Sequence, residues 1–331
     1  MITPVVGEPV VGEPVVGTPV VGKPKVVVVG GAGYVGSVLV PHLLAQGFSV
    51  TVVDNLRQGG EGMLPNFIHP EFHFVEADIL EARKLKELCK GAEMVVNLAA
   101  IVGYPACKKW PEEARRTNVD GVHSLLSALE DSTRLVYFST GSNYGEVPGI
   151  CDEETPLNPL SLYGETKTQA EHLCMERQNS VALRFATAFG LSPRLRLDLM
   201  INDFTYQALV NRYLLVYERH FRRTFIHVHD MARVVSHIYK VWDRAVGLRI
   251  NVGHESLNLT KEDIARELQK KLDFHLYFAD VGKDEDRRNY EVSYARIRGL
   301  GYSTVVDLDR GLGELLAGLR LVRIRNPYSN V

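Results

Sequence analysis

Short uninterrupted apolar runs alternate along most of the chain with segments whose apolar residues recur every three or four positions. Runs of the first kind are typical of strands buried on both faces, and the second pattern is typical of helices that pack on one face. Strands and helices in strict alternation predict a parallel sheet covered by helices on both sides. The predicted strands are 25–29, 49–53, 72–75, 93–98, 133–139 and 180–185, and the predicted helices are 34–46, 81–90, 112–130 and 163–178.

Right-handed crossovers between these strands predict an α/β fold of the Rossmann type, with a doubly wound parallel sheet. The alternation loosens after about residue 186, which indicates a smaller C-terminal domain. Residues 225–252 have the pattern of a further strand–helix–strand unit, so the two domains are expected to interleave. The predicted division is a tail over 1–24, a larger domain over 25–185 to which 225–252 return, and a smaller domain over 186–224 and 253–331.

The N-terminal segment has a composition of its own. Residues 5–24 are four pentapeptides, VVGEP, VVGEP, VVGTP and VVGKP. A Pro at every fifth position prevents a regular helix and removes hydrogen bonds from a sheet interior. The segment also lacks the basic start and unbroken apolar stretch of a signal peptide. We expect an extended low-complexity tail outside the fold, with an assembly or binding tail as the alternative.

Composition excludes several classes of protein. The chain is 45% hydrophobic and 24% charged with a net charge of −2, which fits a globular protein and provides no basic field for nucleic acid. Residues 26–53 contain no Lys, Arg, Asp or Glu, and an uncharged stretch of this length is long enough to cross a membrane. Glycine turns divide it into strand, helix and strand, so no membrane span is expected. The four scattered cysteines form no disulfide or zinc pattern and favour the cytoplasm. His227 and His229 alternate on a predicted strand and so face opposite ways, and no metal site is predicted.

A glycine-rich turn follows the first predicted strand and opens the first helix. Gly30, Gly33 and Gly36 have the GxxGxxG spacing that lets a backbone turn tightly, approach a pyrophosphate and pack a helix closely on a sheet. Asp54 ends the second strand, where a carboxylate binds the adenosine ribose and repels a 2′-phosphate. NAD is therefore favoured over NADP, although Arg57 is near enough to accommodate a phosphate.

Two further strand ends are candidates for the same ligand. Asp78 and Ile79 end the third strand region, where an adenine amino group lies in such a sheet. Leu98, Ala99 and Ala100 end the fourth strand, and small residues there let a dinucleotide pass close to the backbone.

A candidate catalytic pair lies on the last of these predicted helices. Tyr163 and Lys167 are four residues apart and so share one face of it. A Tyr with its ordinary pKa near 10 is a poor base at neutral pH, but a nearby ammonium favours the phenolate. Thr140, at the end of the fifth predicted strand, offers a hydroxyl that can bind the same substrate oxygen.

Together these motifs resemble the extended short-chain dehydrogenase/reductase superfamily and, more narrowly, its NAD-dependent nucleotide-sugar epimerase/dehydratase family. The resemblance covers about residues 25–310 and rests on the motifs as a set: GGAGYVG at 30–36, Asp54, DI at 78–79, LAA at 98–100, TNV at 117–119, FST and YG within 138–145, and YGETK at 163–167.

The resemblance assigns roles to individual residues. Tyr163 would be the acid/base, Lys167 would bind the nicotinamide ribose and tune Tyr163, and Thr140 would orient the sugar hydroxyl. It also implies a homodimer formed through the helices near 112–130 and 163–178. The implied cofactor contacts are Gly30, Gly33, Tyr34, Val35, Gly36, Asp54, Asn55, Asp78, Ile79, Leu98, Ala99, Ala100, Asn118, Tyr163 and Lys167, and the implied contacts to a nucleotide-diphosphate sugar are Thr140, Ser142, Asn202, Arg223 and Arg288.

The implied reaction is oxidation at C4 of the sugar, followed in an epimerase by return of the hydride to the other face of a 4-keto intermediate. The alternatives are a net C4 dehydrogenase or ketoreductase, and a noncatalytic NAD-sensing scaffold. Gly141 and Ser142 replace the Asp-Glu pair of the family's dehydratases, so no elimination of water is expected. Thr187 replaces an Asn of galactose-type epimerases, and the segment 217–222 replaces a glycine-rich one, so the sugar and the nucleotide base stay open. Cys107 could face the substrate, but a small buried filler is the favoured interpretation.

Overall fold

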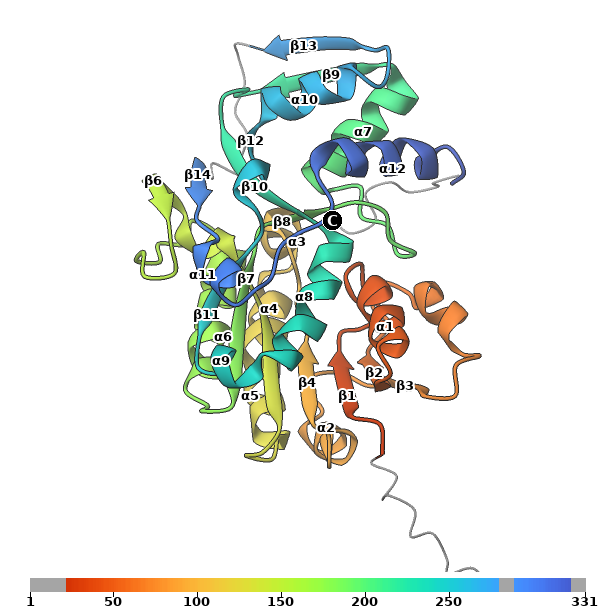
Figure 1. The fold of residues 1–331 in the computed structure, drawn as a ribbon, viewed down its shortest axis with the longest axis vertical. Coiled ribbons are helices and arrows are strands. Elements are labelled where there is room, and N and C mark those ends of the chain that lie inside the picture. Colours follow the sequence, from red (N-terminus) through yellow and green to blue (C-terminus); the bar gives the residue numbers. More distant parts are fainter. Residues whose placement is uncertain (1–21, 280–288, 323–331) are drawn as a thin grey trace, which may run out of the picture.

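A seven-stranded sheet forms the centre of the larger lobe in the computed structural model, which describes residues 22–279 and 289–322 (Figure 1). Every neighbouring pair of its strands is parallel, as predicted, and all six predicted strands belong to it. In spatial order the strands are β11 (Arg249–Val252), β7 (Ser180–Phe185), β5 (Arg134–Thr140), β4 (Met94–Asn97), β1 (Lys25–Val29), β2 (Ser49–Asp54) and β3 (Phe72–Glu76).

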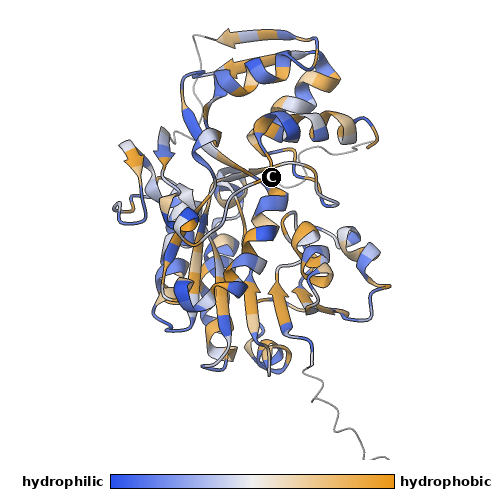
Figure 2. Cartoon of the chain, in the orientation of Figure 1, coloured by the Kyte–Doolittle hydropathy of each residue, from blue (hydrophilic) through white to orange (hydrophobic). Residues whose placement is uncertain are grey.

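Alternating side chains of the central strand β1 enter two separate cores. Val26 and Val28 belong to the core on one face of the sheet, and Val27 and Val29 belong to the core on the other. All four are at most 1% exposed, and Figure 2 shows the strands of this sheet as apolar. A strand buried on both faces needs apolar residues at every position. This explains why most of residues 26–53, which lack charged side chains, lie in the core of the protein.

Helices cover both faces. One core contains side chains of α1 (Gly36–Ala45), α8 (Val228–Lys240), α9 (Trp242–Ala245) and α11 (Ala295–Gly299), and the other contains side chains of α2 (Ala82–Cys89), α5 (Gly121–Ala128) and α6 (Leu162–Met175). Short elements between these are η1 (Glu61–Asn66), α3 (Tyr104–Lys109), α4 (Pro111–Arg115), η2 (Arg116–Asp120), η3 (Gly141–Tyr144) and β6 (Glu146–Cys151), which pairs with β14 (Asn289–Val292).

The helix predicted over 112–130 is interrupted. A π-helical turn, η2, separates α4 from α5, and Asn118 lies in this turn. Its side chain bonds Ile101 N and O and Thr166 Oγ1, at 2.8, 3.0 and 3.0 Å. Such turns concentrate at functional sites, and apolar periodicity alone does not reveal them.

The smaller lobe has its own apolar core, above the carboxyl ends of the large sheet in Figure 1. The unit predicted over 225–252 is a strand, a helix and a strand, but only β11 joins the large sheet, because β10 pairs with β8 and β12. The elements of this lobe are β8 (Thr187–Phe189), α7 (Met200–Asn211), β9 (Tyr213–Tyr217), β10 (Arg222–His227), η4 (Glu255–Leu257), β12 (Asn258–Thr260), α10 (Lys261–Gln269), β13 (His275–Ala279) and α12 (Leu308–Leu319).

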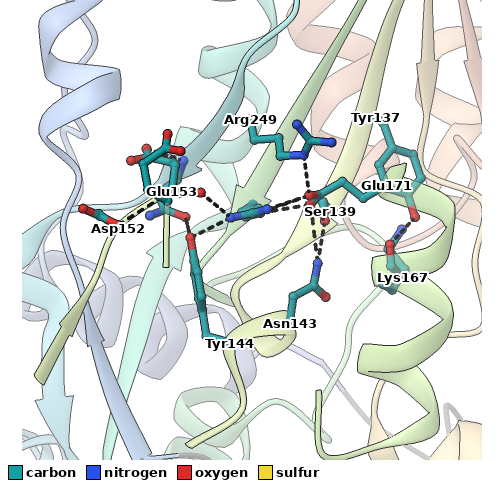
Figure 3. Close-up of polar contacts among 12 residues, drawn as sticks. Tyr137, Ser139, Asn143, Tyr144, Asp152, Glu153, Lys167, Glu171 and Arg249 are labelled. Carbon is teal, nitrogen blue, oxygen red and sulfur yellow. Dashed lines mark hydrogen bonds and ion pairs between the residues drawn. The ribbon is translucent and has the colours of Figure 1, made fainter. Parts of the chain in front are cut away.

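A buried ion pair joins α6 to β7, and its carboxylate, that of Glu171, also accepts a hydrogen bond from Ser139 of β5 (Figure 3). The Arg184 guanidinium contacts both carboxylate oxygens of Glu171 at 2.7–3.2 Å, and Glu171 is fully buried. Ser139 donates a 2.5 Å hydrogen bond to the same carboxylate, and Asn143 donates one at 3.4 Å. The network therefore fixes the end of β5, where Thr140 lies, against the helix that carries Tyr163.

We expect Glu171→Gln to lower the free energy of unfolding by about 3 kcal/mol, because it leaves the Arg184 charge buried without its counter-ion. Urea unfolding of the purified variant measures the change. Arg249→Gln is the matched control, because Arg249 contacts the same carboxylate at 3.2 Å from a side chain that is 37% exposed, and such a pair contributes less than about 1 kcal/mol. Equal losses in the two variants would contradict the expectation.

Candidate active site

A cavity of about 540 Å³ lies at the carboxyl ends of the strands of the large sheet. Binding sites of doubly wound folds occur at this edge. The cavity brings together 14 of the 15 predicted cofactor contacts and two of the five predicted substrate contacts. They are Gly30, Gly33, Tyr34, Val35, Gly36, Asp54, Asn55, Asp78, Ile79, Leu98, Ala99, Ala100, Thr140, Ser142, Tyr163 and Lys167.

The glycine turn leaves no room for side chains at its first and last glycines. Gly30 has φ +78°, and a Cβ there would lie 2.4 Å from Ala99 N. A Cβ on Gly36 would lie 2.1 Å from Gly31 O, because the helix α1 begins directly over the turn. Gly33 differs, since the nearest atom to its added Cβ is Gly30 O at 3.7 Å. The space beside Gly33 therefore opens to the cavity, as backbone that approaches a pyrophosphate requires.

Asp54 holds the turn from the end of β2. One carboxylate oxygen accepts from Ala32 N at 2.9 Å and the other accepts from Leu56 N at 2.8 Å. Burial raises the pKa of Asp54 above its usual range, against these two hydrogen bonds. Beside it, Asn55 donates to Asp78 at 2.8 Å, so the two acids predicted for the adenosine end lie together.

Arg57, the residue that complicates the choice of NAD over NADP, already has partners. Its guanidinium forms an ion pair with Glu113 and lies 4.8 Å from the centre of the Trp110 ring. All three side chains line the cavity. A 2′-phosphate would compete with the Glu113 carboxylate for Arg57 and meet the negative charge of Asp54, which favours NAD.

Thr140 and Ser142 lie where β5 passes into the short helix η3. The Thr140 hydroxyl accepts from Ser142 N and donates to Ser142 Oγ, both at 3.1 Å. Both side chains line the cavity and both are buried. They offer hydroxyl groups to a ligand and no carboxylate.

Tyr163 and Lys167 occupy the first two turns of α6, which begins at the N-cap Ser161. Lys167 is 4% exposed, and its ammonium lies 4.1 Å from the centre of the Tyr137 ring (Figure 3). Burial lowers the pKa of Lys167 from its ordinary 10.5 to about 8. The ammonium therefore predominates at pH 7, within the same cavity as the Tyr163 phenol.

Asn118 is the one predicted cofactor contact that is absent from the cavity lining. It is 1% exposed and does not line the cavity, because its amide bonds Ile101 and Thr166. It ties the loop after β4 to α6, one residue before Lys167. Its contribution to the site is the position of α6.

Two predicted substrate contacts also lie outside the cavity. Asn202 is fully buried, accepts from Gly190 N at 2.9 Å and donates to Arg196 O at 2.9 Å. Arg223 is 2% exposed within β10, where it pairs in register with Leu259. Neither side chain lines this cavity, and their contacts with a substrate stay predictions. Arg288 lies outside the described residues.

The prediction that His227 and His229 face opposite ways is wrong. The strand β10 ends at His227 and the helix α8 begins at Val228, so the two-residue alternation stops there. The rings stack at 5.5 Å, and His227 pairs with Glu314 at 2.7 Å. Cys107 is buried, donates to Ile101 O and does not line the cavity, as expected for a filler.

The cavity residues that sequence reasoning missed include two arginines, Arg194 and Arg196. Both lie in the loop between β8 and α7, whose path no periodic pattern predicts. The available signal was the spacing of two arginines and Asp198 in a segment otherwise rich in Leu.

The chain belongs to the NAD dependent epimerase/dehydratase family, whose profile matches residues 26–253. The predicted family, the Rossmann-type fold and the NAD cofactor are thereby confirmed. At this level the protein is one of the NAD-dependent enzymes that act on nucleotide sugars as epimerases, dehydratases or decarboxylases.

Relatives catalyse more than one reaction. The chain is 26% identical over 308 residues to UDP-glucuronic acid decarboxylase 1 of Danio rerio, covering 88% of this chain and 72% of that protein. It is 35% identical over 182 residues to UDP-glucose 4-epimerase of Halalkalibacterium halodurans, covering 52% and 53%. UDP-glucuronic acid 4-epimerase from Bacillus cereus, solved with UDP-glucuronic acid and NAD, superposes with a TM-score of 0.80 at 25% identity, covering 90% of this chain and 99% of that one.

Within residues 22–279 and 289–322, no helix has the length and apolar character needed to cross a membrane. The same residues contain no cluster of three or more His, Cys, Asp or Glu side chains arranged to hold a metal ion.

We expect Gly33→Ala to weaken NAD binding at least tenfold (about 1.4 kcal/mol) while the melting temperature stays within about 2 °C of the native value. The added methyl group meets no protein atom closer than 3.7 Å, but it enters the space where the ligand approaches the backbone. Calorimetric titration with NAD and thermal unfolding measure the two effects. Gly36→Ala is the control and should reduce both stability and binding. Native NAD affinity in Gly33→Ala would show that the ligand does not approach this turn.

We expect Lys167→Met to abolish turnover and yet to raise the free energy of unfolding at pH 7, by up to about 3 kcal/mol, because a buried cation is removed. The penalty is complete below pH 8, the folded pKa, and disappears as pH rises through 10.5, the unfolded pKa. The advantage of the variant should therefore fall below about 1 kcal/mol at pH 10. Denaturant unfolding at the two pH values, without NAD, measures it. A variant that is less stable than the native protein at pH 7 would contradict this account.

Proposed function

We propose that the protein is a nucleotide-sugar 4-epimerase that holds NAD in this cavity and acts through a 4-keto sugar. One observation supports the proposal above all others: the glycine turn, Asp54, Thr140, Tyr163 and Lys167 line a single cavity. The tyrosine–lysine pair and the dinucleotide turn are far apart in the sequence, so their meeting is the arrangement that C4 oxidation requires.

The cavity residues fit NAD. Gly30 and Gly36 form the turn at the start of α1, and the open space at Gly33 suits a pyrophosphate. Asp54 and Asp78 lie at the end where an adenosine would be recognised, and Ala99 and Ala100 leave room beside the backbone. NAD, when bound, supplies the acceptor for the C4 hydride and returns it.

The residues of this chain would handle the proton and the orientation. The Tyr163 phenolate takes the proton of the C4 hydroxyl as that carbon becomes a carbonyl, and it returns a proton when the carbonyl is reduced from the other face. The buried Lys167 ammonium favours the phenolate electrostatically. Thr140 holds the reacting oxygen by a hydrogen bond, and the enclosed site keeps the reacting groups in position.

In the part of the chain that the structure describes, no carboxylate lines the cavity at the end with Thr140 and Tyr163, where elimination of water would require one. Among described residues, its acidic lining residues are Asp54, Asp78 and Glu113, which lie at the adenosine end. At the end with Tyr163, the residues after Thr140 are Gly141 and Ser142, neither of which exchanges protons at neutral pH. This favours simple oxidation and reduction at C4 over a dehydratase reaction.

We expect the purified protein to interconvert the C4 epimers of one member of a panel of UDP-, GDP- and dTDP-sugars, without net change in absorbance at 340 nm. Tyr163→Phe should reduce turnover at least 1,000-fold, since the variant has no acid/base at C4. Chromatography and mass spectrometry identify the products. A stable keto sugar with accumulated NADH would establish the net oxidoreductase instead, and unchanged turnover in Tyr163→Phe would exclude this mechanism. The homodimer and the cytoplasmic location stay predictions.

A further inference from the structure

The loop between β8 and α7 brings positive charge to the substrate end of the cavity. Arg196 of this loop lines the cavity and interacts electrostatically with Tyr163, whereas Arg194 lines it near Asp54 and bonds Gln58 Oε1 at 2.7 Å. The acids that line the described part of the cavity lie at its other end, beside Arg57 and Asn55. Arg57 and Arg194 lie near these acids, whereas Arg196 and Lys167 are cations on the side of Tyr163.

Arg196 is held side-on by Asp198. Its Nε donates to Asp198 Oδ1 at 3.2 Å, and its Nη2 donates to Asp198 Oδ2. This pairing uses one edge of the guanidinium, and Nη1, on the other edge, has no hydrogen bond to any described residue. The side chain is only 13% exposed. A cation so placed is costly to bury, and its second edge stays available to a ligand in the cavity.

The backbone of this arginine is also fixed. Asn202 donates to Arg196 O at 2.9 Å and accepts from Gly190 N at 2.9 Å. Tyr34, from the glycine turn, donates to Gly190 O at 2.7 Å. Asn202 is thus a positioning residue, which explains its burial behind the site. The loop is preorganised before any substrate binds.

The guanidinium is close enough to the proposed acid/base, Tyr163, to interact with it electrostatically. Its Nη2 lies 3.6 Å from the place that a Cβ on Gly103 would occupy. A sugar whose C4 hydroxyl meets Tyr163 directs its anomeric diphosphate away, because C1 lies across the ring from C4. The substituents near Tyr163 are those of C3 and C5, and C6 is attached to C5. The diphosphate is therefore not the group that Arg196 would meet.

We infer that Arg196 binds a carboxylate on the sugar, so that the preferred substrate is a nucleotide-diphosphate uronic acid with its carboxylate at C6. This inference rests on the proposed function and names the substrate class for the same site. A carboxylate neutralises the open edge of a buried guanidinium with charge-assisted hydrogen bonds, which a neutral hydroxymethyl group cannot do.

The same contact favours retention of CO2. After oxidation at C4 the sugar is a β-keto acid, and loss of CO2 breaks the C5–C6 bond and moves its electron pair into the enolate of the C4 ketone. A guanidinium paired with the carboxylate stabilises the negative charge where it begins, which raises the barrier to that step. The pairing therefore agrees with an epimerase that retains C6.

The test compares pairs of nucleotide sugars that differ only at C6, UDP-glucuronic acid with UDP-glucose and the corresponding GDP and dTDP pairs. Binding is measured by calorimetry on NAD-loaded Tyr163→Phe, which needs no turnover. In one pair the uronic acid should bind about 100-fold more tightly, as expected for charge-assisted bonds. Adding Arg196→Gln should reduce that ratio below about threefold, with the neutral sugar nearly unaffected.

Arg194→Gln is the matched control. This variant removes one positive charge from the same loop. The native Arg194 guanidinium bonds Gln58 Oε1 at 2.7 Å and Leu195 O, so we expect the ratio of the two sugar affinities to be unchanged. The inference is wrong if no pair prefers the acid, or if Arg196→Gln weakens both sugars equally.

Turnover of the protein with intact Tyr163 separates this inference from the proposed function. Epimerised uronic acid of unchanged mass supports both. Tight binding of the acid followed by loss of CO2 supports the carboxylate contact and overturns the epimerase. Epimerisation of the neutral sugar alone supports the epimerase and overturns the carboxylate contact.

Discussion

The buried pair between Glu171 and Arg184 is the interaction on which the geometry of the site depends. It joins α6, which carries Tyr163 and Lys167, to β7 and, through Ser139, to the end of β5 beside Thr140. An ion pair without water is sensitive to displacement, because either charge left alone is strongly destabilising. The helix therefore has one favourable position along the sheet, and that position places the phenol and the Thr140 hydroxyl in one cavity.

Much of the fold follows from the sequence because the sheet is buried on both faces. The apolar runs predicted six of the seven strands of the large sheet, and the glycine spacing predicted the turn that opens α1. The prediction failed where local pattern does not decide the backbone. The break at η2 places Asn118 between the loop after β4 and α6, and β10 ends at His227 because α8 begins there.

The contacts of polar side chains were predicted less well than the helices and strands, for a physical reason. Asn202 bonds a glycine twelve residues before it and packs near Tyr34, which is 168 residues away. Arg223 is buried within a strand whose neighbours come from distant segments. A sequence motif indicates that such a side chain is required, but only the packed loops determine whether it faces the ligand or supports the residue that does. Arg196 shows the opposite situation, because no motif indicated it, yet Asp198 and Asn202 hold it at the cavity wall.

The distribution of charge in the cavity connects cofactor choice with substrate choice. The acids near Asn55 would bind neutral ribose hydroxyls and disfavour an additional phosphate, and Arg196 near Tyr163 would favour an anionic sugar. Under the proposed function, Gly141 and Ser142 would provide no proton shuttle for a dehydratase reaction, and the Arg196 guanidinium would stabilise negative charge near Tyr163. Recognition of the cofactor and recognition of the sugar would then both depend on charged side chains that face one cavity.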